Sequence, residues 1–316
     1  MELKLTKGKA TREAYGSAIL ELGKGNPDIY VVDCDIGKSC KTVTFSQELP
    51  NQHVNVGIAE QNACGVAAGL ATCGKIPFVT TYAVFGSMRM LEQIRQEVCY
   101  PKLNVKIACS HGGFTPASDG ASLQGIEDYG LFRTIPNMTI LTPGDYNSTY
   151  ECVKLAAEFD GPVYLRFTRD PVPTLYPEGY KFEIGKANIL NEGTDITIIT
   201  TGDILAKSTE ACIELEKLGI STRLIDMFTV KPLDKMAIEK AIKETKGIIT
   251  VEDHNIINGL GSAVAEVVAE SDNECKFKRV GIQDQFGESA PYESLLKKNN
   301  ITVEYIVATA KKMLEK

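Results

Sequence analysis

One carboxylate stands among small apolar residues at the start of a helix-like segment. Glu60 lies in NVGIAEQNACGVAAGLA, where most neighbours are Val, Ile, Ala or Gly. A charge in such surroundings costs free energy unless a partner or ligand binds it. An acidic residue in the first turn of a helix is also stabilised by the helix dipole, and composition alone favours that simpler interpretation. The small residues that follow indicate close approach of another element or subunit.

A second group of polar residues fills a long loop. Residues 110–129, SHGGFTPASDGASLQGIEDY, contain His111, Ser118, Asp119 and Ser122 together with four glycines. The segment follows a predicted strand and is longer than a simple connection needs to be. Ligands of doubly wound sheets bind at the carboxyl ends of the strands, so we expect this loop to be functional.

Three dispersed residues are candidates for binding an anion. They are Arg12 in KATRE, Ser39 in DCDIGKS and Arg169 in RFTRDP. A guanidinium can bind a phosphate through two hydrogen bonds. A single surface arginine is more often only a solvated charge, so these residues indicate a phosphate site only if the fold brings them together.

Several common catalytic motifs are absent from the sequence. It has no phosphate-binding P-loop, no dinucleotide fingerprint after the first strand and no nucleophile elbow. The nine cysteines are scattered, without a C-x-x-C pair, and the three histidines are His53, His111 and His254. We therefore predict reduced core thiols and no metal site within this chain.

Length and charge limit the remaining possibilities. A chain of 316 residues predicts about two domains, since a domain takes roughly 150 residues. Lys and Arg total 34 against 41 Asp and Glu, giving a net charge of −7, which argues against nucleic acid or an anionic membrane as partner. We find no signal peptide and no apolar stretch of about 18 residues, so we expect a cytoplasmic protein.

The elements that must position these residues alternate between strand and helix. This order predicts parallel βα units, hence an α/β fold of two doubly wound domains with mainly parallel sheets. Helices are expected at 11–22, 60–71, 88–98 and 146–158, and strands at 29–33, 76–80, 105–108, 138–141 and 163–167. The segment 170–186, with three prolines, predicts a linker. We place domains at 1–172 and 188–316, with the linker at 173–187.

Six segments in order resemble the C-terminal part of transketolase. They are KATREAYGSAILEL, VVDCDIGKS, NVGIAEQNACGVAAGLA, TYAVFGSMR, the 111–124 loop and RFTRD. The resemblance covers the whole chain and implies a pyrimidine-binding domain followed by a transketolase C-terminal domain. The family's G-D-G motif with its following Asn, which binds diphosphate and Mg²⁺, is absent, so the resemblance implies one half of a split transketolase.

The resemblance gives the cofactor residues. Glu60 matches the carboxylate that hydrogen-bonds to the aminopyrimidine ring of thiamine diphosphate, and Tyr82 and Phe85 match aromatic residues that stack around that ring. Asp35 is assigned to the same cofactor site. Where the family has a third aromatic residue, this sequence has Met88.

The sugar-phosphate residues follow in the same way. His111 and Asp119, eight residues apart, match contacts to the acceptor sugar, and Arg12, Ser39 and Arg169 match the phosphate contacts. Glu60 and His111 are thus the predicted catalytic residues. The position four after Asp119, commonly His in the family, is Leu123, which places donor preference in question.

The predicted function is transfer of a two-carbon ketol unit from a ketose phosphate to an aldose phosphate in pentose phosphate metabolism. The partner is an N-terminal subunit that holds the diphosphate and Mg²⁺, in an α₂β₂ assembly, and this chain alone is expected to be inactive. Two alternatives stay open: the β subunit of a 2-oxoacid dehydrogenase, and a non-catalytic scaffold subunit. Deoxyxylulose phosphate synthase shares the stretch Gly57 to Gln61 but has another domain order.

Overall fold

Seven strands form the larger of two sheets in the computed structural model, which describes residues 3–315. The strand order is β10-β5-β6-β4-β3-β1-β2, and all neighbours except β10 are parallel. The strands are β1 (Ile29–Asp33), β2 (His53–Asn55), β3 (Ile76–Tyr82), β4 (Lys106–Ser110), β5 (Thr139–Leu141), β6 (Val163–Arg166) and β10 (Thr229–Lys231). Central strands β4 and β6 are buried throughout, as expected of a parallel sheet covered on both faces.

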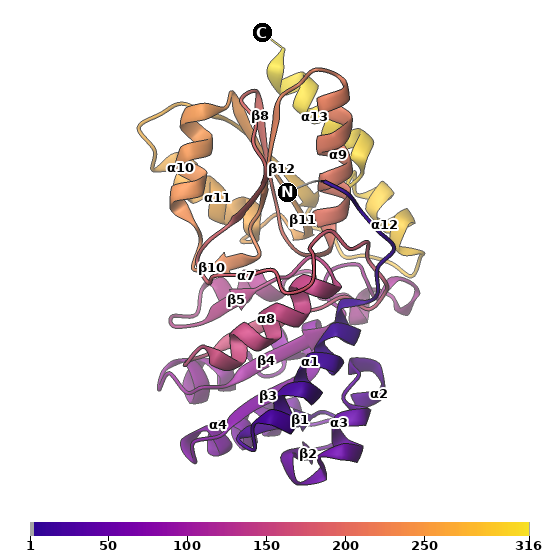
Figure 1. Cartoon of the computed structure of the whole chain (residues 1–316), viewed down its shortest axis with the longest axis vertical. Coiled ribbons are helices and arrows are strands. Elements are labelled where there is room, and N and C mark those ends of the chain that lie inside the picture. The colour runs from indigo at the N-terminus through magenta and orange to yellow at the C-terminus, as the bar shows by residue number, and fades with distance from the viewer. Residues whose placement is uncertain (1–2, 316) are drawn as a thin grey trace.

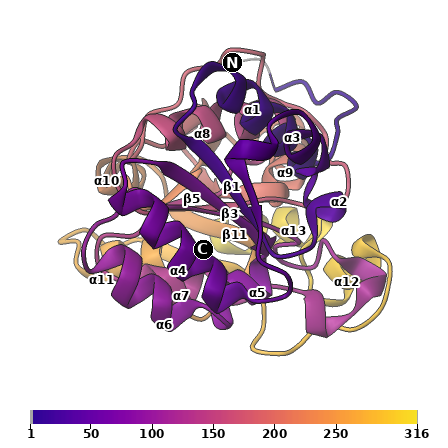
Figure 2. The ribbon, with the colours of Figure 1, turned by 90° about the horizontal axis from the view of Figure 1, so that it is seen from below.

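Helices cover both faces of this sheet. Viewed from below, α1, α3 and α8 lie on one face and α4, α6 and α7 on the other (Figure 2). The helices are α1 (Thr11–Gly25), α2 (Gly37–Cys40), α3 (Val43–Glu48), α4 (Glu60–Thr72), α5 (Ala83–Met88), α6 (Leu91–Gln93), α7 (Asp128–Arg133) and α8 (Tyr146–Glu158). Short 3₁₀ turns span 50–52, 117–119 and 121–123, and a π-helical segment spans Ile94–Cys99.

A smaller five-stranded sheet is built by the second half of the chain and is stacked on the first unit (Figure 1). Its order is β12-β11-β8-β9-β7, with only β7 antiparallel. The strands are β7 (Asn188–Asn191), β8 (Ile196–Thr200), β9 (Thr222–Asp226), β11 (Gly247–Asn255) and β12 (Lys276–Ile282). The helices are α9 (Leu205–Lys217), α10 (Lys235–Glu244), α11 (Leu260–Ala269), α12 (Tyr292–Lys298) and α13 (Val303–Leu314), with a 3₁₀ turn at 202–204.

Two features differ from the sequence-based expectation. The helix predicted over 88–98 is wrong as one element: α5, α6 and the π-helical segment divide it, because the backbone leaves the helical region at Met90 (φ −112°, ψ 16°), whose side chain is fully buried. Strand β10 comes from the second half of the chain yet pairs antiparallel with β5 of the first sheet. The two units therefore share a sheet edge.

The segment between the units is attached to the start of α8. Asp145 caps this helix, accepting a hydrogen bond from the Ser148 amide at 2.7 Å. Its other carboxylate oxygen accepts from the amides of Leu175 and Tyr176 at 2.7 and 2.8 Å. Residues 170–186 contain no helix or strand.

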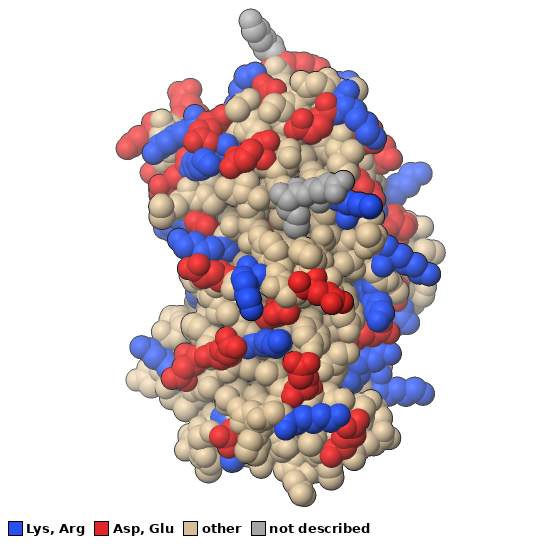
Figure 3. Space-filling model, viewed as in Figure 1, with Lys and Arg blue, Asp and Glu red and all other residues tan. Residues whose placement is uncertain are grey.

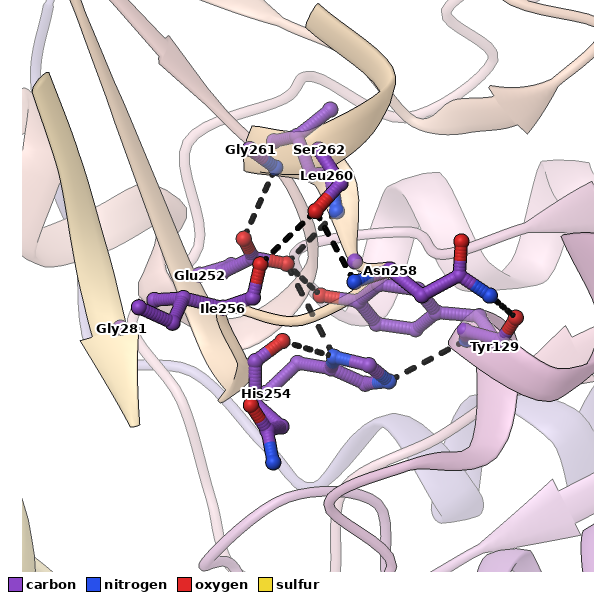
Figure 4. A network of polar contacts seen from close by, with 12 residues as sticks. Tyr129, Glu252, His254, Ile256, Asn258, Leu260, Gly261, Ser262 and Gly281 are labelled. Carbon is purple, nitrogen blue, oxygen red and sulfur yellow. Dashed lines mark hydrogen bonds and ion pairs between the residues drawn. The ribbon is translucent and has the colours of Figure 1, made fainter. Parts of the chain in front are cut away.

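A buried polar network joins α7 of the first unit to β11 and α11 of the second (Figure 4). Tyr129 donates a hydrogen bond to Glu252 at 2.8 Å, and Glu252 also accepts from the amides of Leu260 and Gly261. Burial lowers the pKa of His254 to about 4, and its neutral ring accepts from the Gly130 amide at 3.2 Å. His254 is thus a contact residue between the units.

The visible face of the molecule carries interspersed acidic and basic side chains (Figure 3). Within residues 3–315 we find no helix with the length and apolar character needed to cross a membrane.

Candidate active site

The carboxyl ends of adjacent parallel strands bring four predicted residues to one edge of the first sheet. Strands β6, β4, β3 and β1 are neighbours in that order. Tyr82 ends β3, and Asp35, His111 and Arg169 follow shortly after β1, β4 and β6. This is the edge at which doubly wound sheets bind ligands.

Glu60 is buried, with 5% of its surface exposed, in the first turn of α4. Its carboxylate accepts a hydrogen bond from Arg89 Nη1 at 2.9 Å. Arg89 is half exposed, and its guanidinium lies 4.0 Å from the centre of the Phe85 ring. Glu60, Arg89 and neighbouring residues 58–62 line an open depression. Sequence reasoning missed Arg89, although a charge in the otherwise apolar GSMRML was a usable signal.

Three rings form a stack beside this carboxylate. The centre of the Tyr82 ring lies 3.9 Å from that of His111 and 5.7 Å from that of Phe85. Tyr82 and Phe85 keep partly exposed faces, and Met88 is 45% exposed. The aromatic side chains therefore line the site and are not buried in the hydrophobic core.

His111 occupies a left-handed backbone conformation (φ 66°) directly after β4, which turns its ring into the site. Its Nδ1 lies 2.8 Å from the Ser110 hydroxyl. Burial, together with the charges of Arg12 and Arg169, lowers the pKa of His111 to about 3. The imidazole is therefore neutral near pH 7. The His111 turn is joined to the segment that leads to Arg169, since the Gly112 amide donates to the Phe167 carbonyl at 3.2 Å.

Asp119 and Arg169 form a pair that sequence reasoning treated as separate. The carboxylate of Asp119 lies 3.4 Å from Nε of Arg169, and both side chains are 32% exposed. Such a partly solvated pair is weak, so Arg169 can exchange this carboxylate for another anion.

Arg12 and Ser39 also meet, but through the Ser39 backbone. Nη1 of Arg12 donates to the Ser39 carbonyl at 2.9 Å, while Nε of Arg12 is buried without a hydrogen-bond partner. A buried unpaired donor is costly, which fits an arginine that receives an anionic ligand.

Asp35 lies on the loop after β1 and is exposed, with φ 64° and a hydrogen bond from Asn55 to its carboxylate at 3.0 Å. Asp33, which sequence reasoning did not single out, is buried and organises this loop. It accepts hydrogen bonds from the Ile36 amide at 3.0 Å and from the Thr42 hydroxyl. Leu123 is partly buried on the 121–123 turn.

Two family models match the chain. The transketolase pyrimidine-binding domain matches residues 7–174, and the transketolase C-terminal domain matches residues 185–306. The chain belongs to the transketolase family. Transketolases depend on thiamine diphosphate, and the domain that binds the pyrimidine of this cofactor is present here.

Two relatives that match this chain over most of their own length are a transketolase section and a transketolase subunit. A putative transketolase C-terminal section from Methanocaldococcus jannaschii is 44% identical over 310 residues, covering 97% of this chain and 96% of that protein. The 6-deoxy-6-sulfo-D-fructose transketolase subunit SqwH of Clostridium sp. (strain MSTE9) is 36% identical over 305 residues, covering 96% and 94%.

A solved split gene transketolase, described as an inactive beta4 tetramer, has a TM-score of 0.89 and 46% identity, covering 97% of this chain and 98% of that one. The predicted transketolase resemblance and α/β fold are therefore confirmed. These matches favour a transketolase subunit over the β subunit of a 2-oxoacid dehydrogenase. The roles of individual site residues stay predictions.

Proposed function

We propose that this chain is the C-terminal subunit of a split transketolase that transfers a two-carbon ketol unit from a ketose phosphate to an aldose phosphate. The observation that carries the sugar-phosphate assignment is the way the fold joins the segments of Arg12, Arg169 and His111. Thr11 and Thr168, the residues before the two arginines, share a hydrogen bond at 3.1 Å, and the amide of Gly112, the residue after His111, donates to the Phe167 carbonyl at 3.2 Å. Each arginine alone would be an ordinary surface charge, whereas two beside one polar ring make a site for an anionic substrate end.

The residues present fit the pyrimidine part of thiamine diphosphate. Glu60 offers a buried carboxylate at the open depression, and Tyr82 and Phe85 offer ring faces beside it. When bound, the cofactor supplies a nucleophilic carbon and an electron sink for cleaving the bond next to a ketone carbonyl. Glu60 would hold and orient the pyrimidine ring through a hydrogen bond, and the aromatic side chains would exclude water from it.

Substrate positioning is assigned to the other site residues. His111, neutral near pH 7, can donate or accept a hydrogen bond at a sugar hydroxyl. Asp119 can accept from a hydroxyl of the acceptor, and Arg169, Arg12 and Ser39 would bind the phosphate. Asp35, at the same sheet edge, is proposed to contact the cofactor.

We assign the diphosphate and Mg²⁺ to an N-terminal partner subunit, because the sequence motif that binds them in the family is not in this chain. The active particle we propose is α₂β₂, since a site shared between two kinds of chain needs both of them. We place it in the cytoplasm, in pentose phosphate metabolism, where reducing conditions suit the nine free cysteines.

The decisive experiment uses the tagged chain purified with its native partner. We expect ketol transfer from xylulose 5-phosphate to ribose 5-phosphate that requires both thiamine diphosphate and Mg²⁺, and no transfer by the chain alone. A parallel assay with 6-deoxy-6-sulfofructose as donor separates a phosphate preference from a sulfonate preference. Cofactor-dependent 2-oxoacid decarboxylation without ketol transfer would replace the proposal with the dehydrogenase assignment.

A further inference from the structure

The 111–124 loop is hydrogen-bonded to the C-terminal unit. It has no strand or long helix of its own, only two 3₁₀ turns. Three hydrogen bonds cross from it to the second unit: the Phe114 amide donates to Asp253 Oδ2 at 2.8 Å, Gln124 Nε2 donates to the Glu288 carbonyl at 3.0 Å, and Ser289 Oγ donates to the Ser118 carbonyl at 2.6 Å.

Asp253 makes the most deeply buried of these contacts. It lies in β11 with 1% of its surface exposed. The loop backbone passes directly over its carboxylate, since a Cβ placed on Gly113 would lie 2.2 Å from Asp253 Oδ2. Gly113 itself has φ 59°, a conformation that disfavours larger residues. The close approach and the left-handed turn together explain glycine at this position.

Arg166 also links this loop region to strand β11. This fully buried guanidinium donates to the Gly125 carbonyl at 3.1 Å and to the Asp253 backbone carbonyl at 2.9 Å, and its Nε donates to Asp128 at 2.8 Å. The Cβ of a residue in place of Gly112 would lie 2.3 Å from Nε of Arg166. Arg166 therefore packs against the loop while linking both units.

The Asp253 carboxylate has partners that keep it in place. The Tyr292 hydroxyl donates to Asp203 and lies 3.4 Å from Asp253 Oδ2. Arg166 Nη1 lies 3.8 Å from Asp203. Burial and the neighbouring Asp203 raise the pKa of Asp253 well above its usual range, which favours one shared proton between the two carboxyls.

We propose that the C-terminal unit positions the substrate loop, with Asp253 as a positioning residue that holds His111 and Asp119 at the sugar site. The effect of Asp253 on substrate binding rests on the proposed function, whereas its effect on the order of the loop does not. A segment with little regular structure pays a large conformational entropy cost when ordered, and buried hydrogen bonds from a second unit offset that cost. The second unit thereby takes part in substrate binding without touching the substrate.

The first test measures hydrogen exchange of the loop peptide 111–124 in the full chain. Asp253→Ala removes the acceptor of the Phe114 amide, so we expect exchange about tenfold faster or more, because a buried donor left without its acceptor loses about that much stabilisation. Asp253→Asn keeps an acceptor and is expected to exchange within about threefold of the parent chain. The matched control is Asp226→Ala: this buried carboxylate of β9 accepts from Tyr176 at 2.6 Å and should leave the loop peptide unchanged.

If Asp253→Ala does not fold, Ser289→Ala carries the same test. Ser289 is exposed, so its loss leaves the core intact while removing one bond to the loop. Unchanged loop exchange in the folded Asp253 and Ser289 variants would overturn the proposal, and so would equal acceleration in Asp226→Ala.

The second test uses the complex with its partner. Asp253→Ala is expected to raise the KM for the acceptor sugar about tenfold while leaving the Kd for thiamine diphosphate unchanged, and Asp253→Asn should restore most of the loss. Equal weakening of cofactor and sugar would indicate general damage and contradict the positioning role. A parent complex without any ketol transfer would contradict the proposed function, and the exchange measurement would still decide whether Asp253 holds the loop.

Discussion

Arg89 donates a hydrogen bond to the buried carboxylate of Glu60 at 2.9 Å from the exposed side of the site. Its guanidinium also lies over the Phe85 ring, so one side chain contacts two residues proposed to bind the pyrimidine ring. The charge of Glu60 is thereby paired before any ligand arrives. A pyrimidine ring that hydrogen-bonds to Glu60 must share or replace this contact.

Removing Arg89 is expected to strengthen cofactor binding. In Arg89→Ala the competitor for Glu60 is gone, so the Kd for thiamine diphosphate in the complex should fall by about threefold to tenfold. Because Arg89→Ala leaves the buried Glu60 carboxylate without this partner, the free energy of unfolding should fall by about 1–3 kcal/mol. Isothermal titration measures the Kd, and Arg95→Ala, on the neighbouring π-helical segment, is the control. Weaker cofactor binding in Arg89→Ala would show that Arg89 helps to hold the ring.

Replacing Glu60 is expected to abolish turnover without unfolding the chain. Glu60→Gln retains the shape but loses the charge that orients the pyrimidine, so kcat should fall by about 100-fold or more. Ketol transfer by the complex gives the rate, and thermal unfolding gives the stability. Glu48→Gln, at an exposed carboxylate paired with Lys24, should leave both values unchanged. Near-normal turnover in Glu60→Gln would favour the scaffold interpretation.

Arg169 is expected to contribute to binding more than to the chemical step. Arg169→Ala leaves Asp119 without its partner at 3.4 Å and removes one of two charges at the anion site. The KM for phosphorylated substrates should rise about tenfold to 100-fold with kcat within about threefold. Unphosphorylated sugars serve as the internal comparison. An equal loss for both kinds of sugar would exclude a phosphate contact.

Acid should destabilise the fold partly through His111. Its folded-state pKa is lowered to about 3 by burial and by Arg12 and Arg169, whereas an unfolded histidine titrates near 6.5. Between these values the unfolded chain binds a proton that the folded chain does not, so stability falls as pH falls through this window. The slope from this residue is at most about 1.4 kcal/mol per pH unit.

The variant that tests this is His111→Asn, because asparagine tolerates the positive φ at this position. Urea unfolding at several values between pH 4 and 7 should show a smaller loss of stability for the variant than for the parent chain. His254, whose pKa is lowered to about 4, contributes in the same direction in both proteins and cancels in the difference. Identical pH dependence of the two chains would contradict the depressed pKa of His111.

Much of the fold could be predicted because its signals are local. The alternation of Val- and Ile-rich strands with helices predicted parallel sheets, and the predicted bounds of β1 and α8 agree with the structure. The break at Met90 and the edge strand β7 were missed, since both depend on packing rather than on local pattern.

The sequence by itself determined the family, the two α/β units and the candidate residues Glu60, Tyr82, Phe85 and His111, since ordered motifs carry that information without contacts. Only the tertiary structure decided which distant residues and strands pair with one another. Phe114 and Asp253 are 139 residues apart, and β10 (229–231) joins a sheet whose other strands all lie within residues 29–166. Such contacts form only when the two units pack together. Burial then requires each polar group to find a hydrogen-bond partner among groups that are distant in the sequence. No local sequence pattern predicts which groups pair.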